Sequence, residues 1–331
     1  MKTWTFQNGI YVESSGTVAG PKEAAGPLSE SFDQTYQDLY CGEESWELAE
    51  RKLMEDAITH ALKKANRKQE DIDIFIAGDL LNQMITSNYN ARKLAIPYLG
   101  VFSACATVME AVAIGAMMID GGFAHSILLA TSSHHAASER QFRYPNEFGY
   151  QRQETASYTV TGAGACILSQ KKTNIKISAA TIGAVVDYDM KNPFQFGATM
   201  APAAAATIKS HLDNTKTSVG DYDCILTGDL ARVGSGILHK LLEEEEIKLS
   251  HTYDDCGTMI YYTDQAVNAG GSGAACCAVV TFGHVFKLMR KGVFKKVLVV
   301  ATGSLLNPFM IYQKQSIPTI AHAVAFERED M

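Results

Sequence analysis

One cysteine in the sequence is placed where covalent chemistry is feasible. Cys105 stands at the start of residues 104–119, an apolar segment that predicts a helix buried on nearly all sides. The free N–H groups and the dipole at a helix N-terminus favour the thiolate, which is the nucleophilic form of cysteine. Cys105 is therefore the candidate nucleophile. The sequence leaves open that it is simply a small apolar core residue, since free cysteines are often buried.

Polar residues that follow two predicted strands are the next candidates. Asp79 comes after the apolar run 73–77, and His134 and His135 come after the run 126–131. An imidazole can act as the general base for a thiol. Adjacent side chains on a strand point to opposite faces, so only one of the two histidines can reach a shared pocket. Asp79 fits a turn or a helix cap as well as it fits a ligand contact.

The elements that must position these residues occur twice. The segment Asp73-Ile-Phe-Ile-Ala-Gly-Asp79-Leu80 returns 150 positions later as Asp223-Cys-Ile-Leu-Thr-Gly-Asp229-Leu230. Farther along, residues 127–131 match residues 298–302 at an offset of 171 positions. Units of this length exceed the repeats of solenoid proteins. We therefore expect two similar halves, residues 1–185 and 186–331, whose corresponding loops converge on one site.

Helices and short buried strands alternate in both halves. Apolar residues recur at helical spacing from Trp46 to Ala65, behind Ser45 as an N-cap. Residues 165–168 and 175–180 are expected to pair as antiparallel strands, and residues 1–44 to form an irregular segment with one short strand near residues 9–12. The alternation predicts an α/β fold whose parallel or mixed sheet is covered by helices on both faces.

The composition excludes several classes of protein. The net charge of −7 over 331 residues argues against a nucleic-acid-binding face, which needs a basic surface. The seven cysteines are odd in number and form no C-x-x-C pair, which indicates a reducing compartment and no resident metal or other cofactor. The N-terminus has no signal-peptide core, and charges and glycines interrupt the longest apolar region, residues 108–130. We expect a cytoplasmic or membrane-peripheral protein.

The sequence resembles the thiolase and β-ketoacyl synthase superfamily in three features taken together. These are the two halves, the cysteine at the start of a buried helix and the run Thr161-Gly-Ala-Gly-Ala165. That resemblance implies a thiolase-like fold of two pseudo-repeated halves in α/β/α/β/α layers. It also implies a homodimer, because members of the superfamily bury a sheet edge across a two-fold axis. Five segments are similar to the stage V sporulation protein AD family in particular: residues 78–83, 101–106, 131–135, 158–165 and 316–324.

The narrower resemblance implies a function in sporulation. It implies binding of dipicolinic acid (pyridine-2,6-dicarboxylate) and a place in the machinery that moves this compound into the developing spore. The implied partners are dipicolinic acid and the membrane subunits of the stage V sporulation transport complex. The implied location is the cytoplasm or the periphery of the forespore or spore inner membrane.

The superfamily resemblance also identifies catalytic groups that this sequence lacks. Condensing enzymes combine the cysteine with His and Asn, or with two His, from the second half. Here Asp229 stands near the expected His, and Gly271 stands at the expected Asn. Losing one such partner commonly costs several orders of magnitude in rate. The sequence therefore favours a binding protein on a catalytically degenerate scaffold. The alternatives are an active acyltransferase or condensing enzyme that uses Cys105 with a relocated histidine, and a scaffold with a vestigial pocket.

A flat ligand with two carboxylates needs apolar walls and two separated groups of donors. Backbone N–H groups at the start of the Cys105 helix are expected to receive one carboxylate. Asp79 would repel an anion unless it is protonated, paired or bridged by Ca²⁺, so calcium is expected only as a counter-ion of the ligand. Besides Cys105, the candidate ligand-binding residues are Asp79, Asn82, Gln83, Ser133, His134, Ser304, Ser316 and His322.

Overall fold

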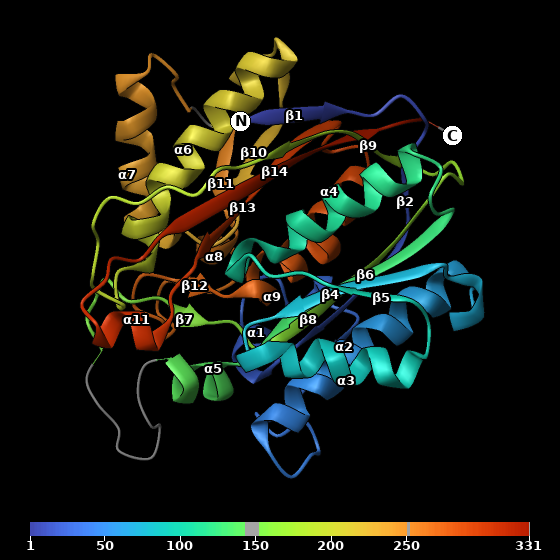
Figure 1. The fold of residues 1–331 in the computed structure, drawn as a ribbon, viewed down its shortest axis with the longest axis horizontal. Helices are drawn as coiled ribbons and strands as arrows, with labels where there is room; N and C mark the ends of the chain where they lie inside the picture. Colours follow the sequence, from blue (N-terminus) through green and yellow to red (C-terminus); the bar gives the residue numbers. More distant parts are fainter. Residues whose placement is uncertain (143–151, 250–251, 331) are drawn as a thin grey trace.

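The computed structural model describes residues 1–142, 152–249 and 252–330. Its strands form one 12-stranded sheet and one small 2-stranded sheet. The large sheet has two parts. Among the described residues, the strand pairing that joins them is that of Tyr11 in β2 (Tyr11–Ala19) with Lys176 in β9 (Ile175–Ile182). In Figure 1 these two parts lie on either side of a central layer of helices. The molecule is therefore built from two sheets in separate layers.

The two sheets have the same strand order, as the repeat in the sequence predicts. The first runs β5 (Tyr98–Gly100), β4 (Ile74–Asp79), β6 (Ser126–Ser133), β8 (Gly162–Ser169), β2, and the second runs β11 (Tyr253–Asp255), β10 (Cys224–Thr227), β13 (Lys296–Ser304), β14 (Thr319–Arg328), β9. In each sheet, counted in the order just given, the chain visits the positions in the order fifth, second, first, third, fourth. The strand β9 belongs to the second sheet, although it precedes residue 185, the boundary that the sequence suggests between the halves.

Helices complete five layers in the order α/β/α/β/α, which confirms the predicted architecture. The first sheet is covered on its outer face by α2 (Trp46–Ala65) and α3 (Ile85–Leu94), and the second by α6 (Phe196–Thr215) and α7 (Ala231–Glu244). The central layer holds α4 (Thr107–Asp120) and a continuous run made of α9 (Ala274–Val279), the π-turn Val280–Val285 and α10 (Phe286–Arg290). Apolar side chains from both sheets pack against this layer and form the main core.

Shorter elements connect these layers. The helices are α1 (Pro21–Ala24), α5 (His135–Phe142), α8 (Cys256–Met259) and α11 (Pro308–Tyr312), and the strands are β1 (Lys2–Thr5), β3 (Gln34–Thr35), β7 (Tyr158–Thr159) and β12 (Gly271–Ser272). Single 3₁₀ turns occur at Ser29–Ser31, Gln69–Asp71, Asn82–Met84, Ala104–Ala106 and Val219–Asp221. Among the described residues, no helix is both long and apolar enough to cross a membrane.

Two predictions of local structure are wrong. Residues 1–44 are not mainly irregular, because β2 is a nine-residue strand inside the large sheet. Its small residues conceal the strand: a Cβ on Gly16 would lie 2.1 Å from the carbonyl oxygen of Ala57, so α2 packs directly on the β2 backbone. The pair predicted between residues 165–168 and 175–180 does not form either, because β8 lies between β2 and β6 while β9 pairs with β14.

Candidate functional site

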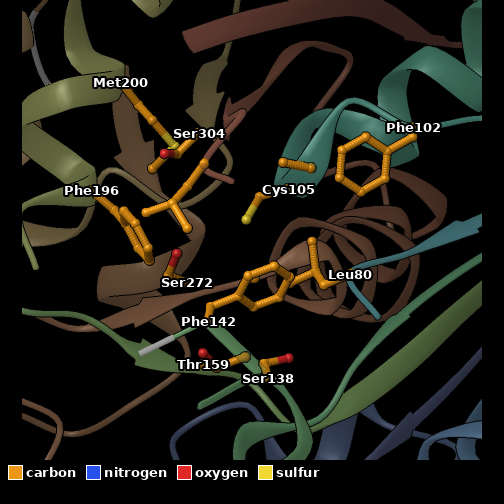
Figure 2. A pocket seen from close by; sticks show the side chains of 13 residues that line it. Leu80, Phe102, Cys105, Ser138, Phe142, Thr159, Phe196, Met200, Ser272 and Ser304 are labelled. Carbon is orange, nitrogen blue, oxygen red and sulfur yellow. The ribbon is translucent and has the colours of Figure 1, made fainter. Parts of the chain in front are cut away.

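A narrow pocket lies between the two halves at the start of α4 (Figure 2). It encloses about 520 Å³ when its open mouth is included, but the part that can hold the centre of a water molecule is only about 40 Å³. Its walls are mainly apolar, and its shape suits a small ligand better than a bulky one. The lining residues are Leu80, Phe102, Ala104, Cys105, Ser138, Phe142, Thr159, Phe196, Met200, Ser272, Gly273, Ser304 and Leu306.

The turn Ala104–Ala106 directs Cys105 into this pocket (Figure 2). The turn packs against β13, where a Cβ on Gly303 would lie 2.2 Å from the carbonyl oxygen of Ser103, so only glycine fits there. Ala104 has a φ of 50°, a left-handed conformation that costs a non-glycine residue energy. Tight packing between the two halves therefore fixes the backbone on either side of the thiol.

The group that faces the Cys105 thiol is the carboxylate of Asp229, the residue that stands near the histidine expected from the superfamily resemblance. Asp229 is buried, and the thiol donates a hydrogen bond to it. Burial and the neighbouring carboxylate together hold the pKa of the Cys105 thiol well above its ordinary value. The expectation that the helix N-terminus stabilises a thiolate here is therefore wrong. Desolvation and a facing negative charge outweigh the helix dipole.

Three further donors hold the Asp229 carboxylate in place. The Ser272 hydroxyl donates to Oδ2 at 2.6 Å, the Thr302 hydroxyl donates to Oδ1 at 2.6 Å, and the Gly273 N–H donates to Oδ2 at 3.0 Å. Even with these hydrogen bonds, burial raises the pKa of Asp229 above its ordinary value. The four donors come from the turn before α4, from β12 and its following residue, and from β13. Both halves therefore build the base of the pocket.

His322 is the predicted histidine from the second half, and it does not face the thiol. Its Nδ1 accepts the Gly183 N–H at 3.3 Å, so the ring proton lies on Nε2, which can donate to Ser103 Oγ at 3.2 Å. An Nε2 that carries its proton cannot act as a base toward Ser103. Burial lowers the pKa of His322 to about 4. His322 does not line the pocket and braces the turn next to Cys105.

His134 also lies outside the pocket lining, which contradicts its expected position. Its Nε2 donates to the carbonyl oxygen of Leu39 at 2.7 Å, and its Nδ1 accepts the Ala137 N–H at 3.4 Å. Burial lowers the pKa of His134 to about 4. The neighbouring His135 stacks on the Tyr158 ring with 3.7 Å between centroids. Neither histidine supplies a relocated base to Cys105, because each imidazole is engaged elsewhere.

Asp79 is similarly displaced from the expected position. Its Oδ1 accepts the Leu81 N–H at 3.0 Å, and its Oδ2 accepts the N–H and the hydroxyl of Ser87 at 2.8 and 2.7 Å. The carboxylate is fully buried and shapes the turn that leads into α3, where its neighbour Leu80 reaches the pocket. The alternative reading of Asp79 as a turn residue is the one that the geometry matches.

The remaining sequence candidates divide between the surface and the interior. Asn82 and Gln83 lie exposed in the 3₁₀ turn before α3, and the Ser316 hydroxyl donates to Asp187 at 2.6 Å away from the pocket. The Ser133 hydroxyl donates to the carbonyl oxygen of Val160 at 2.8 Å and lies behind the lining. Of the predicted set, only Cys105 and Ser304 line the pocket, so the structure does not bring the others to it.

Two serine hydroxyls in the pocket have no hydrogen-bond partner among the described residues. Ser138 Oγ comes from α5 and Ser304 Oγ from the end of β13, and both atoms are buried. Figure 2 shows them on opposite sides of the Cys105 thiol. Buried hydroxyls nearly always have a partner, so these two are available to a ligand or to water. Ser138 was not recognisable from the sequence, because only the packing of α5 turns it toward Cys105.

The described residues contain no group of three or more His, Cys, Asp or Glu side chains that could hold a metal ion. The fixed groups of the site are thus a protonated thiol, a buried carboxylate and uncharged hydroxyls. This arrangement can bind a small ligand by hydrogen bonds. Among the described lining residues there is no imidazole that could generate a thiolate for acyl transfer.

Comparison with known proteins gives the same fold and adds a family. The stage V sporulation protein AD model matches residues 1–327. The stage V sporulation protein AD of Bacillus subtilis (strain 168) is 54% identical over 327 residues, which are 99% of this chain and 97% of that protein.

Solved structures of condensing enzymes are similar to this chain in fold. A variant of OleA from Xanthomonas campestris has a TM-score of 0.62 at 14% identity, covering 98% of this chain and 99% of its own. The 3-oxoacyl-[acyl-carrier-protein] synthase III of Aquifex aeolicus VF5 has a TM-score of 0.58 at 13% identity, covering 96% and 100%. At such low identity the likeness shows a thiolase-like fold and nothing about activity. With the match along nearly its whole length, the chain belongs to the stage V sporulation protein AD family.

Proposed function

We propose that this protein binds dipicolinic acid in the pocket beside Cys105, as a peripheral subunit of the spore's dipicolinate uptake machinery. The observation that carries the proposal is the pairing of the Cys105 thiol with Asp229 where an active condensing enzyme needs an imidazole. A thiol held in its protonated form is a poor nucleophile. The protein therefore keeps a pocket between its two halves but has no imidazole placed to activate the Cys105 sulfur.

The shape and polarity of the pocket support this ligand class. The walls include Phe102, Phe142 and Phe196, which suit the faces of an aromatic ring. The two unpartnered hydroxyls of Ser138 and Ser304 lie on opposite sides of the thiol, as two separated carboxyl groups on one ring require. The space that can hold water is narrow, so a long acyl chain would need the walls to open.

Calorimetric titration of the full chain with dipicolinate tests the proposal, with and without Ca²⁺. We expect saturable binding of one ligand per chain. Binding should be lost when the pocket is filled by Ser304→Phe and retained in Ser316→Phe, which places the same bulk outside the pocket. Absence of saturable binding under both conditions would rule out this function.

The second candidate is an acyltransferase or condensing enzyme that uses Cys105. The observation in its favour is that Cys105 lines the pocket at the start of α4, where the superfamily resemblance places the nucleophile. Incubation with acyl-CoA substrates followed by intact-mass measurement distinguishes the two. Stable acylation of Cys105 with subsequent turnover would favour the enzyme, and an unmodified chain that binds dipicolinate favours the carrier.

A further inference from the structure

The base of the pocket carries a negative charge that the lining does not balance. Asp229 lies directly behind the Cys105 thiol and is only 1% exposed. The lining residues Ser138, Thr159, Ser272 and Ser304 offer uncharged hydroxyls, and no Lys, Arg or His side chain is among the described lining residues. An anion that enters beside Asp229 therefore meets a second anion in a poorly solvated space, which is costly unless the charge is neutralised.

The groups that face Asp229 from the surrounding elements do not supply a cation either. They are the thiols of Cys105, before α4, and Cys276, in α9, the hydroxyls of Ser272 and Thr302, and a second acid, Asp255, at the end of β11. Beyond these, Tyr253 of β11 faces Asp255. Every titratable group placed here among the described residues is an acid, a thiol or a phenol, so a proton is the nearest available counter-charge.

Asp255 does not neutralise the charge on Asp229, because its carboxylate is held by hydrogen bonds to other groups. It accepts the Thr227 hydroxyl at 2.7 Å and the N–H groups of Leu230 and Ala231 at 2.9 Å each. Burial and, to a smaller extent, the charge of Asp229 raise the pKa of Asp255 to about 7. The two acids therefore disfavour one another's ionisation. Asp229 is the acid nearer the ligand space, because it is hydrogen-bonded to the lining residues Ser272 and Gly273.

We propose that Asp229, one layer behind the pocket wall, determines which charge form of a ligand the pocket accepts, so that a carboxylate ligand binds together with one proton. The inference rests on the proposed function for the identity of the ligand, but its mechanism applies to any carboxylate in this pocket. Hydrogen bonds from Ser272, Thr302 and Gly273 fix the Asp229 side chain, so it cannot turn away from an incoming anion. Asp229 is thereby a specificity-determining residue that excludes the fully ionised ligand.

The sign of the resulting pH dependence follows from proton linkage. The bound anion makes ionisation of Asp229 less favourable, so binding to the form of the protein in which Asp229 is ionised takes up a proton. Proton uptake on binding means that affinity falls as pH rises, by at most about tenfold per pH unit for one proton. A ligand with no carboxylate should show no such dependence.

Calorimetric titration with dipicolinate between about pH 6 and about pH 8, in two buffers of different ionisation enthalpy, measures both affinity and proton uptake. The wild-type chain should take up close to one proton per ligand and bind more weakly as pH rises. Asp229→Asn should bind more tightly than wild type at the high-pH end and lose most of the uptake, because the facing charge is gone. Asp187→Asn, an exposed acid of the same half, is the matched control and should behave as wild type.

Circular dichroism of Asp229→Asn establishes that the variant is folded, and pyridine, which has no carboxylate, serves as the uncharged probe. The inference is overturned if wild-type binding is independent of pH, or if Asp229→Asn keeps the full proton uptake. If the variant does not fold, the buffer comparison on wild type alone decides: uptake well below one proton contradicts the inference. No dipicolinate binding at any pH would instead refute the proposed function, and this outcome is distinct from pH-independent binding.

Discussion

At the scale of single residues, the chemical character of the site depends on the group that faces the Cys105 sulfur. The superfamily resemblance led us to expect Asp229 near the position of the catalytic histidine, and the structure places Asp229 beside the Cys105 thiol. The sequence predicted the wrong charge state for the thiol, because a pKa depends on burial and on neighbours that arrive from distant parts of the chain. For the same reason Ser138 was missed, while Asp79 and His134 were expected at a pocket that they do not line.

The first prediction concerns the reactivity of Cys105. Because its pKa is raised by burial and by Asp229, alkylation by iodoacetamide at neutral pH should be slower than that of an exposed cysteine. Asp229→Asn removes the facing charge, lowers the pKa of the thiol and should speed the reaction. Peptide mass spectrometry after timed labelling measures the rate, with the buried Cys166 as an internal control that stays unreacted. Fast labelling of Cys105 in the wild-type chain would contradict the assignment of a protonated thiol.

The second prediction concerns the two unpartnered hydroxyls. Ser138→Ala and Ser304→Ala should each weaken dipicolinate binding by about 1.5 to 3 kcal/mol, the range for a hydrogen bond to a charged group. Neither should destabilise the unliganded protein, because each removes a buried polar atom that has no partner. Calorimetry and thermal unfolding measure the two effects, and Ser316→Ala is the control outside the pocket. Wild-type affinity in both variants would show that the ligand contacts lie elsewhere.

At the scale of elements, sequence patterns predicted the long helices and the apolar strands. They did not predict elements whose position depends on packing against distant parts of the chain. The helix from Trp46 to Ala65 and the buried strand β6 follow from periodicity and composition. The strand β2 was mostly missed, because Ser14, Ser15 and Gly16 are not typical strand residues and serve here to let α2 approach closely. The pairing of β9 was mispredicted because no local pattern tells which sheet a strand joins.

The third prediction concerns Glu23, a fully buried carboxyl that ties α1 to both halves. It accepts hydrogen bonds from the Tyr261 hydroxyl and, at 3.0 Å, from the Thr161 N–H. Burial raises its pKa from 4.5 to about 7. The folded state thus holds the proton more tightly than the unfolded state, so stability is lost as pH rises from about 4.5 to about 7, by up to about 3 kcal/mol.

Urea unfolding at about pH 4.5 and about pH 8 tests this sign. Glu23→Gln keeps a polar group at the same place but cannot ionise, so the free energy of unfolding of wild type should fall relative to that of the variant at the higher pH. An equal change with pH in both proteins would mean that Glu23 is not the titrating group.

At the scale of the whole molecule, the duplication visible in the sequence predicted two similar halves, and the superfamily resemblance predicted the five layers; the two sheets and their common strand order agree with both. The offsets between the repeats were sufficient to predict the two halves, because corresponding strands occupy corresponding positions. They did not show that β9 belongs to the second sheet, nor that Tyr11 and Lys176 pair where the two sheets join. Those features arise where the halves meet, and the internal repeat carries no information about that contact.

The fourth prediction concerns dimerisation, which the superfamily resemblance implies. The edge strand β5 ends the first sheet, and partly exposed apolar side chains surround it: Ile85, Tyr89, Leu99 and Phe102, each 39% to 47% exposed. An apolar sheet edge is suited to pairing with a second copy. We expect a dimer by light scattering, and a monomer for Leu99→Asp. Val293→Asp, at an apolar residue that is 59% exposed away from this edge, should remain dimeric. A monomeric wild-type chain would contradict the prediction.

We propose that the pocket beside Cys105 binds dipicolinate and does not carry out acyl transfer. A crystal structure of the chain soaked with dipicolinate tests this most directly, since electron density locates the ligand and shows the state of the sulfur. We expect the ring between the aromatic walls, carboxyl groups at Ser138 and Ser304, and an unmodified Cys105 facing Asp229. Density for the ligand at another site, or a pocket that stays empty at saturating concentration, would contradict the account.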